Sequence, residues 1–231
     1  MLKHHYFIGD FDLSLKVVSC LDTEIVHHLR DVLKLETGEE VVICDGQGQA
    51  ALARIEKIER NSISFFVKEL LPGVLNDKKI TLYAALLKRD SFEWLLQKAV
   101  ETGVSEIVPI ISERTVKIGF NEKRWQKIIK EAAEQSQSLI LPKLLPIQNL
   151  KEAFKNVKGV GVFFDSVGKD VKDIKINDTN ISLFIGPEGG WSDKEIELGK
   201  ETGLRLVNLG TSILRAETAA TVAVYLAKNI F

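Results

Sequence analysis

The sequence is poor in the residues that most often build metal sites, disulfides and nucleophilic centres. Its 231 residues include two cysteines, Cys20 and Cys44, whose spacing matches no metal-binding motif. We therefore expect two buried free thiols rather than a disulfide. The four histidines form two adjacent pairs, His4–His5 and His27–His28. Because adjacent side chains point apart on a helix or a strand, no metal site is expected there.

Several nucleotide-binding and hydrolytic motifs are absent. The sequence has no Gly-x-x-x-x-Gly-Lys-Ser/Thr P-loop and no Gly-x-Ser-x-Gly elbow, and no Gly-x-Gly-x-x-Gly follows the first strand expected after residue 73. Histidine is absent after residue 28, which excludes a Ser-His-Asp hydrolase in the later part of the chain. If the protein is an enzyme, its cofactor is therefore not one that a P-loop or a Gly-x-Gly-x-x-Gly motif binds.

Long apolar runs are also absent. The most apolar stretch, Ala219–Ala227, is too short to span a bilayer, and Met1–Asp10 has no apolar core of signal-peptide length. The composition, 45% hydrophobic and 27% charged, is ordinary for a globular protein. We therefore expect a cytoplasmic protein that does not associate with membranes.

The net charge of −1 hides an uneven distribution along the chain. Residues 1–72 have 8 Lys and Arg against 12 Asp and Glu, residues 73–151 have 13 against 9, and residues 152–231 have 10 against 11. Phosphate contacts supply most of the affinity for RNA. An RNA-binding role therefore requires a locally basic face within the acidic first part.

Residues 1–72 have the pattern of a small β-rich domain, and the number of short strands predicts a compact barrel. Strands are predicted at Glu40–Cys44, Ala50–Ile58 and Ile63–Leu70, with a hairpin turn at Asp45–Gly48. Apolar residues at helical spacing predict a helix over Thr23–Leu33. Three of its side chains are expected to face inward: Leu29, Val32 and Leu33.

Pro72–Lys79 has the composition of a linker, and from Ile80 onward predicted strands and helices alternate, as in an α/β layered domain. The strands are expected at 81–87, 106–112, 160–165, 183–185 and 205–209. The helices are expected at 90–103, 121–138, 150–157, 192–202 and from about residue 215 to the end, the first of them capped by the run that starts at Asp90.

The segment 182–220 has the strongest functional signal. Its apolar runs Leu183–Ile185 and Leu206–Leu209 are each followed by glycine, as expected where buried parallel strands end. Glycines expose backbone groups to a ligand, and α/β sheets bind ligands at the carboxyl ends of their strands. Ser192 and Glu195 have capping-box spacing, so part of the segment also has a purely structural interpretation. We expect one ligand between the two loops.

Phe184–Trp191 together with Leu209–Ala220 resembles the paired cofactor loops of the SPOUT methyltransferases, whose C-terminal segment forms a trefoil knot. Within that superfamily the sequence is most similar to the RsmE family, which methylates N3 of a uridine in 16S ribosomal RNA. Further matching stretches follow in the family's order: Lys88–Ala99, Ile107–Pro109, Ser112–Arg114, Arg124–Trp125 and Glu131–Ser136. Gln137–Ser138 departs from the Gly-Arg that family members often have, so this sequence has no arginine at that position to face RNA.

The resemblance implies a PUA-like RNA-binding barrel at residues 1–72 and a SPOUT domain at 73–231, with the knot at about 182–220. It also implies a homodimer that acts on the 30S ribosomal subunit with S-adenosylmethionine as cofactor. The adenine of that cofactor needs apolar walls and backbone hydrogen bonds. The residues expected to bind it are Ile185, Gly186, Glu188, Gly189, Gly190, Leu209, Gly210, Ile213, Leu214 and Ala219.

Arg215 and Glu217 are the candidate catalytic residues, because core packing alone does not require them at the start of the last helix. A guanidinium can stabilise charge that develops on the uracil oxygens, and a carboxylate can accept the N3 proton or orient the arginine. The alternative for Glu217 is that it only stabilises the start of the helix.

Five residues are candidates for RNA contact. His28, Arg30 and Lys34 can face RNA from one helix, although the same residues also suit a solvated helix face, and Lys88 and Arg89 follow from the family resemblance. A non-catalytic RNA-binding or ribosome-assembly factor on a SPOUT-like fold remains the alternative function; it predicts no S-adenosylmethionine binding and tolerance of Gly189→Val. A different nucleotide-using α/β enzyme is the third possibility.

Overall fold

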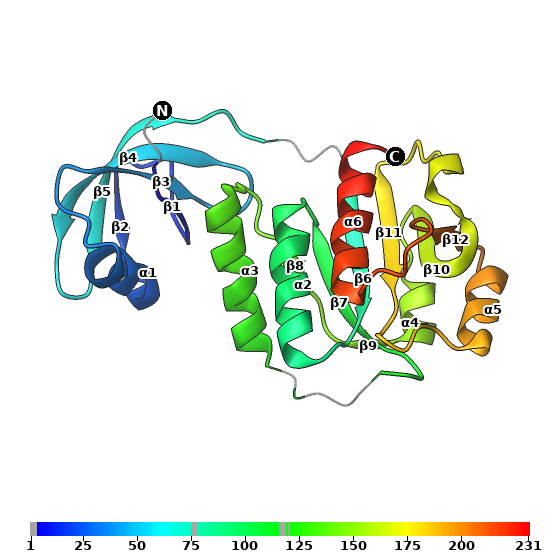
Figure 1. Ribbon diagram of the computed structural model, residues 1–231. Coiled ribbons are helices and arrows are strands. Elements are labelled where there is room, and N and C mark those ends of the chain that lie inside the picture. Colours follow the sequence, from blue (N-terminus) through cyan, green and yellow to red (C-terminus); the bar gives the residue numbers. More distant parts are fainter. Residues whose placement is uncertain (1–3, 75–77, 116–118, 120) are drawn as a thin grey trace. The chain divides into compact units, whose positions relative to one another are not determined.

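The computed structural model describes residues 4–74, 78–115, 119 and 121–231, which form two compact units (Figure 1). The first unit comprises Met1–Leu75 and Ala133–Leu141, and the second comprises Asn76–Ala132 and Pro142–Phe231. The domain boundary between residues 72 and 73 stays a prediction, because positions 75–77 of the predicted linker lie outside the described residues.

The first unit is built on a five-stranded sheet in the order β1-β3-β4-β5-β2, in which only β1 and β3 are parallel. The strands are β1 (Tyr6–Ile8), β2 (Val17–Cys20), β3 (Glu40–Cys44), β4 (Ala50–Ile58) and β5 (Ile63–Leu70). The three predicted strands and the hairpin between β3 and β4 are confirmed. The two edge strands were not predicted, because three or four residues carry too little periodicity.

The predicted helix in this unit is α1 (Thr23–His27), continued by the π-helical turn η1 (His28–Val32). The side chain of Asp22 caps α1 by accepting hydrogen bonds from two backbone N–H groups. Leu29 faces inward as predicted, but the same expectation for Val32 was wrong, since Val32 is 59% exposed. The π turn, closed by a hydrogen bond from Leu33 N to His28 O, adds a residue per turn and rotates Val32 out of the apolar stripe.

Residues 133–141 belong to the first unit and pack on its earlier part, which the sequence did not indicate. The backbone N–H of Gly48 donates to Leu139 O at 3.0 Å, and the carboxylate of Glu134 accepts the N–H of Ile8 at 2.9 Å.

Cys44, like Cys20, is a buried free thiol, as predicted. Burial, with smaller contributions from the nearby carboxylates of Asp45 and Glu134, raises the pKa of the Cys44 thiol to about 12.

The second unit is built on a parallel sheet in the order β12-β10-β11-β6-β7-β8, with β9 paired to β7 (Figure 1). Its strands are β6 (Lys79–Ala85), β7 (Glu106–Ile111), β8 (Lys143–Leu144), β9 (Gln148–Asn149), β10 (Val160–Asp170), β11 (Asn180–Ile185) and β12 (Arg205–Asn208). Its helices are α2 (Arg89–Glu101), α4 (Leu150–Lys155), the 3₁₀ turn η2 (Val171–Asp173), α5 (Asp193–Glu201) and α6 (Ala216–Asn229), together with the part of α3 (Glu122–Ser136) that precedes residue 133. The predicted alternation of strands and helices is confirmed.

Aromatic rings fill the core between this sheet and its helices. Phe184 on β11 stacks on Tyr83 of β6 at a centroid distance of 4.5 Å, and Phe163 on β10 stacks on Trp191 at the same distance. Phe154 of α4 packs edge-on against Phe163 and Phe184. These contacts bury large apolar surfaces beneath the carboxyl ends of β10 and β11.

Two features of the second unit bring distant segments to one edge of the sheet. β10 lies between β11 and β12 and is parallel to both, so the loops that follow these strands open at the same edge. β12 is an outer strand, whereas α6, which begins eight residues after it, packs on β6, β11 and α2 (Figure 1). Residues 209–215 therefore pass back across the ends of the strands.

Candidate active site

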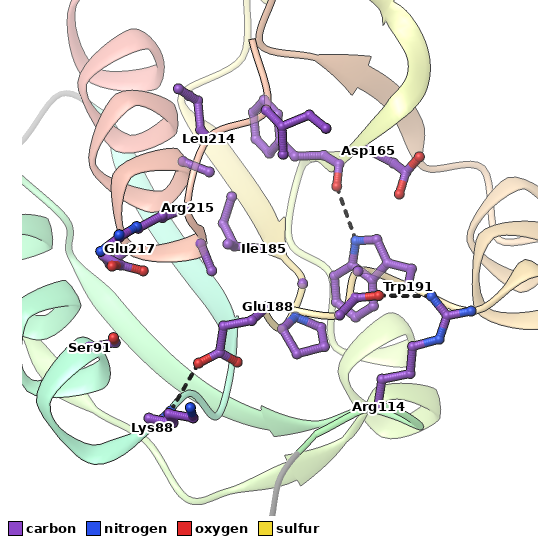
Figure 2. Close-up of a pocket in the computed structure, with 18 residues that line it drawn as sticks. Lys88, Ser91, Arg114, Asp165, Ile185, Glu188, Trp191, Leu214, Arg215 and Glu217 are labelled. Carbon is purple, nitrogen blue, oxygen red and sulfur yellow. Dashed lines mark hydrogen bonds between the residues drawn. The ribbon is translucent and has the colours of Figure 1, made fainter.

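A cavity of about 710 Å³ opens at the carboxyl ends of the parallel strands (Figure 2). Its walls come from the loops after β6 and β7, the middle of β10, the glycine loop 186–190 and the segment before and within the first turn of α6. The lining residues are Lys88, Ser91, Arg114, Phe164, Asp165, Ile185, Gly186, Pro187, Glu188, Gly189, Gly190, Trp191, Ile213, Leu214, Arg215, Ala216, Glu217 and Ala219.

The glycine loop packs directly on Trp191. A Cβ added at Gly186 would lie 3.0–3.2 Å from the indole ring, so only glycine fits without displacement. The indole Nε1 donates to Phe164 O at 3.0 Å, which holds the ring beneath the cavity. At the other end of the loop, Gly190 has φ +69°, and its N–H donates to Pro187 O at 2.8 Å. Glycine is required here for the close approach and for the turn.

A second, smaller cavity of about 370 Å³ lies against residues 207–214. It shares Phe164, Asp165, Ile213, Leu214 and Ala219 with the larger cavity, so the two form one bilobed site. Gly210 has φ +119°, and its N–H donates to the side-chain oxygen of Asn208 at 2.9 Å. Ile213 is 98% exposed and borders both lobes.

The structure brings together all ten residues predicted to bind the cofactor. Ile185, Gly186, Glu188, Gly189 and Gly190 line the larger lobe. Leu209 and Gly210 line the smaller lobe, and Ile213, Leu214 and Ala219 line both. The site therefore has two glycine-containing loops and apolar side chains around one space, while the role of each residue stays a prediction.

Arg215 and Glu217 line the larger lobe, and their side chains lie beside each other on the α6 side of it (Figure 2). Arg215 is the N-cap residue of α6 and makes no side-chain capping hydrogen bond. Glu217 lies in the first turn of the same helix, where a carboxylate also interacts favourably with the helix dipole. The structure thus permits both the catalytic and the structural interpretation of Glu217.

Seven lining residues were not predicted as site residues: Ser91, Arg114, Phe164, Asp165, Pro187, Trp191 and Ala216. Asp165 directly follows the apolar part of β10, and Arg114 follows β7 after only two residues. Because ligands bind at the carboxyl ends of parallel strands, Asp165 and Arg114 could both have been predicted as site residues from their positions after apolar strand segments. Trp191 gave no such signal, because its role depends on packing against Gly186.

The loop after β6 supplies Lys88 to the cavity, whereas Arg89 does not line the cavity and contacts Glu93 instead. The Nε of Arg89 donates to Glu93 at 3.2 Å, and Arg124 makes two hydrogen bonds to the same carboxylate at 2.5 and 2.6 Å. The hydrogen bond from Arg124 is the main reason that the pKa of Glu93 is held below its ordinary value.

The predicted cap at Asp90 was wrong. The helix α2 begins at Arg89, and Lys88 is its N-cap residue. The backbone N–H of Lys88 donates to the carboxylate of Glu188 at 3.2 Å.

The RNA-binding residues predicted in the first unit differ in how they are held. Arg30 donates two hydrogen bonds to Asp31, each of 2.7 Å, and a third to Arg60 O. The hydrogen bonds from Arg30 and His27 hold the pKa of Asp31 well below its usual range. His28 packs edge-on against Phe7, and Lys34 is exposed with φ +54°. Lys34 is thus presented to solvent, whereas the guanidinium of Arg30 is already engaged.

Neither a metal site nor a membrane span is found in the part of the chain that the structure describes. Its histidine, cysteine and carboxylate side chains form no group of three or more that could hold a metal ion. None of its helices is long and apolar enough to cross a bilayer.

Comparison with known families defines the class of protein. Residues 75–228 match the model of an RNA methyltransferase domain, and residues 21–68 match the model of an RNA methyltransferase PUA domain. The chain is thus an RNA methyltransferase in which a PUA domain precedes the catalytic domain. The predicted fold class, a SPOUT-like α/β domain with a small N-terminal PUA-like domain, is confirmed.

Individual relatives narrow the class further. The ribosomal RNA small subunit methyltransferase E of Mesomycoplasma hyopneumoniae is 35% identical over 94% of this chain and 95% of its own length. The crystal structure of the enzyme of that name from Neisseria gonorrhoeae, bound to S-adenosyl methionine, is 30% identical with a TM-score of 0.93 and covers 99% of this chain and 98% of its own. A methyltransferase from Legionella pneumophila in complex with the same cofactor is 27% identical with a TM-score of 0.87, covering 97% and 96%. The chain belongs to the ribosomal RNA small subunit methyltransferase E (RsmE) family.

Proposed function

We propose that this enzyme transfers a methyl group from S-adenosylmethionine to N3 of a uridine in 16S ribosomal RNA, with the assembled 30S subunit as substrate. The observation that carries the proposal is the convergence of two glycine-containing loops on one bilobed site, with Arg215 and Glu217 on its wall. Two structural relatives were crystallised with that cofactor, and many relatives are named for small-subunit ribosomal RNA.

The residues present fit S-adenosylmethionine. The larger lobe, at about 710 Å³, has the size of a typical small-molecule site. Ile185, Leu214 and Ala219 offer apolar walls, and the loops containing Gly189 and Gly210 offer backbone groups that no side chain covers. When bound, the cofactor supplies an electrophilic methyl group on a sulfonium. The protein has to hold that group in line with the attacking nitrogen, and such positioning accounts for much of the rate.

Uridine N3 carries a proton at neutral pH, so its attack requires a proton acceptor and stabilisation of the resulting negative charge. We assign the charge stabilisation to the guanidinium of Arg215, which can donate to a uracil carbonyl oxygen that carries the negative charge. We assign the proton acceptor to Glu217, whose carboxylate lies beside Arg215 in the larger lobe (Figure 2). The target base has to leave its stack to enter the lobe.

The test is methylation of purified 30S subunits by Arg215→Ala and Glu217→Gln, with Lys194→Ala as a control at an exposed position of α5. We expect kcat to fall at least about 100-fold in both variants, in the range seen when a charge-stabilising donor or a general base is removed. If Glu217 only stabilises the helix, Glu217→Gln lowers thermal stability slightly and leaves kcat unchanged. Near-wild-type methylation by both variants would refute the two assignments.

Two measurements separate this function from a non-catalytic assembly factor. Isothermal titration calorimetry with S-adenosylmethionine tests cofactor binding, and mass spectrometry of 16S RNA from a strain that lacks the gene identifies the modified base. The non-catalytic alternative predicts no heat of binding, no missing methyl group and full function of Gly189→Val.

RNA recognition is assigned to exposed cations in both units. Lys34 of the first unit and Lys88 and Arg89 of the second are the strongest candidates, because each side chain is exposed. His28 and Arg30 complete the proposed set, and contact between RNA and Arg30 requires exchange of its bonds to Asp31. Loss of phosphate contacts should reduce the dependence of RNA affinity on salt.

We also propose that the enzyme acts as a homodimer in the cytoplasm, where its ribosomal substrate is assembled. The support for the dimer is the outer face of α6, on which Tyr225 is 53% exposed; Ile230, which follows the helix, is 66% exposed. Large apolar side chains left in water close together in the chain are typical of a surface that is covered in the functional assembly.

A further inference from the structure

The glycine loop 186–190 has few side chains of its own and is held by contacts from two other loops (Figure 2). The N–H of Lys88 donates to the Glu188 carboxylate at 3.2 Å, and Nη1 of Arg114 donates to Gly189 O at 2.8 Å. Lys88 follows β6 and Arg114 follows β7, and these two strands are neighbours in the sheet. The loop is therefore tied to the ends of two adjacent strands.

The peptide group between Gly189 and Gly190 is held at both ends. Its carbonyl accepts the hydrogen bond from Arg114, and its N–H donates to Pro187 O at 2.8 Å. Because a peptide group is planar, these two contacts fix its orientation. Glycine loses more conformational freedom on ordering than other residues, so a run of two glycines needs such external contacts.

Arg114 is itself held in place through its neighbour. The N–H of Glu113 donates to one carboxylate oxygen of Glu195 at 2.8 Å, and the other oxygen accepts the N–H of Ser192 at 2.8 Å. Glu195 is buried and belongs to the first turn of α5, directly after the glycine loop. The contacts thus form a closed chain from the loop through Arg114 and Glu195 back to the end of the same loop.

We propose that Arg114 is a positioning residue that sets the glycine loop in the conformation that receives the methyl donor. This inference rests on the proposed function. A loop that is ordered before binding spares the ligand the entropy cost of ordering it, so the contact increases affinity. Arg114 acts through Gly189 rather than on the reacting atoms, so its removal should weaken cofactor binding and leave the chemical step almost unchanged.

The test compares Arg114→Ala and Arg114→Lys with wild type, with Lys194→Ala as a control that removes an exposed cation from α5. Hydrogen exchange of the ligand-free protein should show faster exchange of the backbone N–H groups of residues 188–191 in Arg114→Ala. Calorimetry should show S-adenosylmethionine bound about tenfold more weakly, with kcat at saturating cofactor within about threefold of wild type. Arg114→Lys keeps one donor and should restore part of the affinity, and it replaces the alanine variant should that variant fail to fold.

Unchanged exchange and unchanged affinity in Arg114→Ala would overturn the proposal. A fall in kcat with unchanged affinity would also overturn it, since that result assigns Arg114 a direct catalytic role. If wild type itself binds no S-adenosylmethionine, the proposed function fails, whereas the exchange measurement on the ligand-free protein still decides whether Arg114 orders the loop.

Discussion

Gly186 and Gly189 belong to the same loop but have different surroundings. A Cβ at Gly186 would lie 3.0–3.2 Å from the ring of Trp191, which is buried, stacks on Phe163 and donates to Phe164 O. A Cβ at Gly189 would meet Arg114 at 3.6 Å, an ordinary contact distance. The same small substitution therefore tests two different local structures.

We expect Gly186→Ala to lower the free energy of unfolding by about 1–3 kcal/mol, because the added methyl group overpacks the ring of Trp191. It should also weaken S-adenosylmethionine binding, since Trp191 lines the larger lobe. Gly189→Ala should change stability by less than about 0.5 kcal/mol. Urea denaturation and calorimetry measure both quantities, and a larger effect at Gly189 than at Gly186 would contradict the prediction.

At the scale of single residues, the sequence was informative where chemistry is visible in the residue type. The glycines after β11 and β12 were found because glycine at the carboxyl end of a parallel strand exposes backbone groups to a ligand. Arg215 and Glu217 were found because core packing does not require a charged residue at either position. Arg114 was quoted only as part of a family match. Its contact with Gly189 joins positions 75 residues apart, and no local pattern reports such a contact.

At the scale of elements, the start of α5 makes both local capping hydrogen bonds and a hydrogen bond to a segment far away in the sequence. The capping box predicted from Ser192 and Glu195 is confirmed, with both reciprocal hydrogen bonds present. The carboxylate of Glu195 also accepts the N–H of Glu113, far away in the sequence. The two capping residues should therefore differ in their contribution to stability.

We expect Ser192→Ala to cost about 1 kcal/mol, the usual loss for an N-cap residue. Glu195→Ala should cost more, because its removal leaves two backbone N–H groups without their acceptor. Urea denaturation of the two variants measures the difference. Equal losses would show that the hydrogen bond to Glu113 contributes nothing.

A second element-scale feature is the buried carboxylate of Glu106 at the start of β7. It is 5% exposed and accepts hydrogen bonds or ion pairs from Lys79 at 2.9 Å, Lys158 at 3.3 Å and Thr81 at 3.1 Å. Burial by itself raises the pKa of this carboxyl, but Lys79 and Lys158 together outweigh it, so the pKa is lowered. A lowered folded-state pKa means that the ionised group stabilises the fold.

We expect Glu106→Gln to cost about 1–3 kcal/mol at pH 7, since it removes charged hydrogen bonds from a buried site. Stability from Glu106 is fully present above the ordinary glutamate pKa, about 4.3, and is lost as the pH falls through the lowered folded-state pKa. The difference between wild type and Glu106→Gln should therefore shrink on acidification. Urea denaturation from pH 7 to pH 3 measures it, and a constant difference would contradict the assignment.

At the scale of the whole molecule, the homodimer proposal rests on the outer face of α6. We expect Tyr225→Glu to shift the protein from dimer to monomer, because it places a charge in an apolar contact. Light scattering coupled to size exclusion measures the mass, with Lys194→Glu as a control for an added negative charge elsewhere. A fully active wild-type monomer, or a Tyr225→Glu dimer of unchanged affinity, would refute the proposed interface.

Local patterns in the sequence determined most elements of this protein, because hydrophobic periodicity, turn residues and caps act over a few positions. They predicted β3–β7, β10–β12, the helices α1 to α6 and the two glycine loops, and the family resemblance added the cofactor and the reaction. Tertiary structure alone decided the position of β10 between β11 and β12, the packing of residues 133–141 within the first unit and the exposure of Val32. It also decided how Arg114 and Glu195 hold the glycine loop. These features depend on contacts between segments far apart in the chain, whose free energy no local propensity contains.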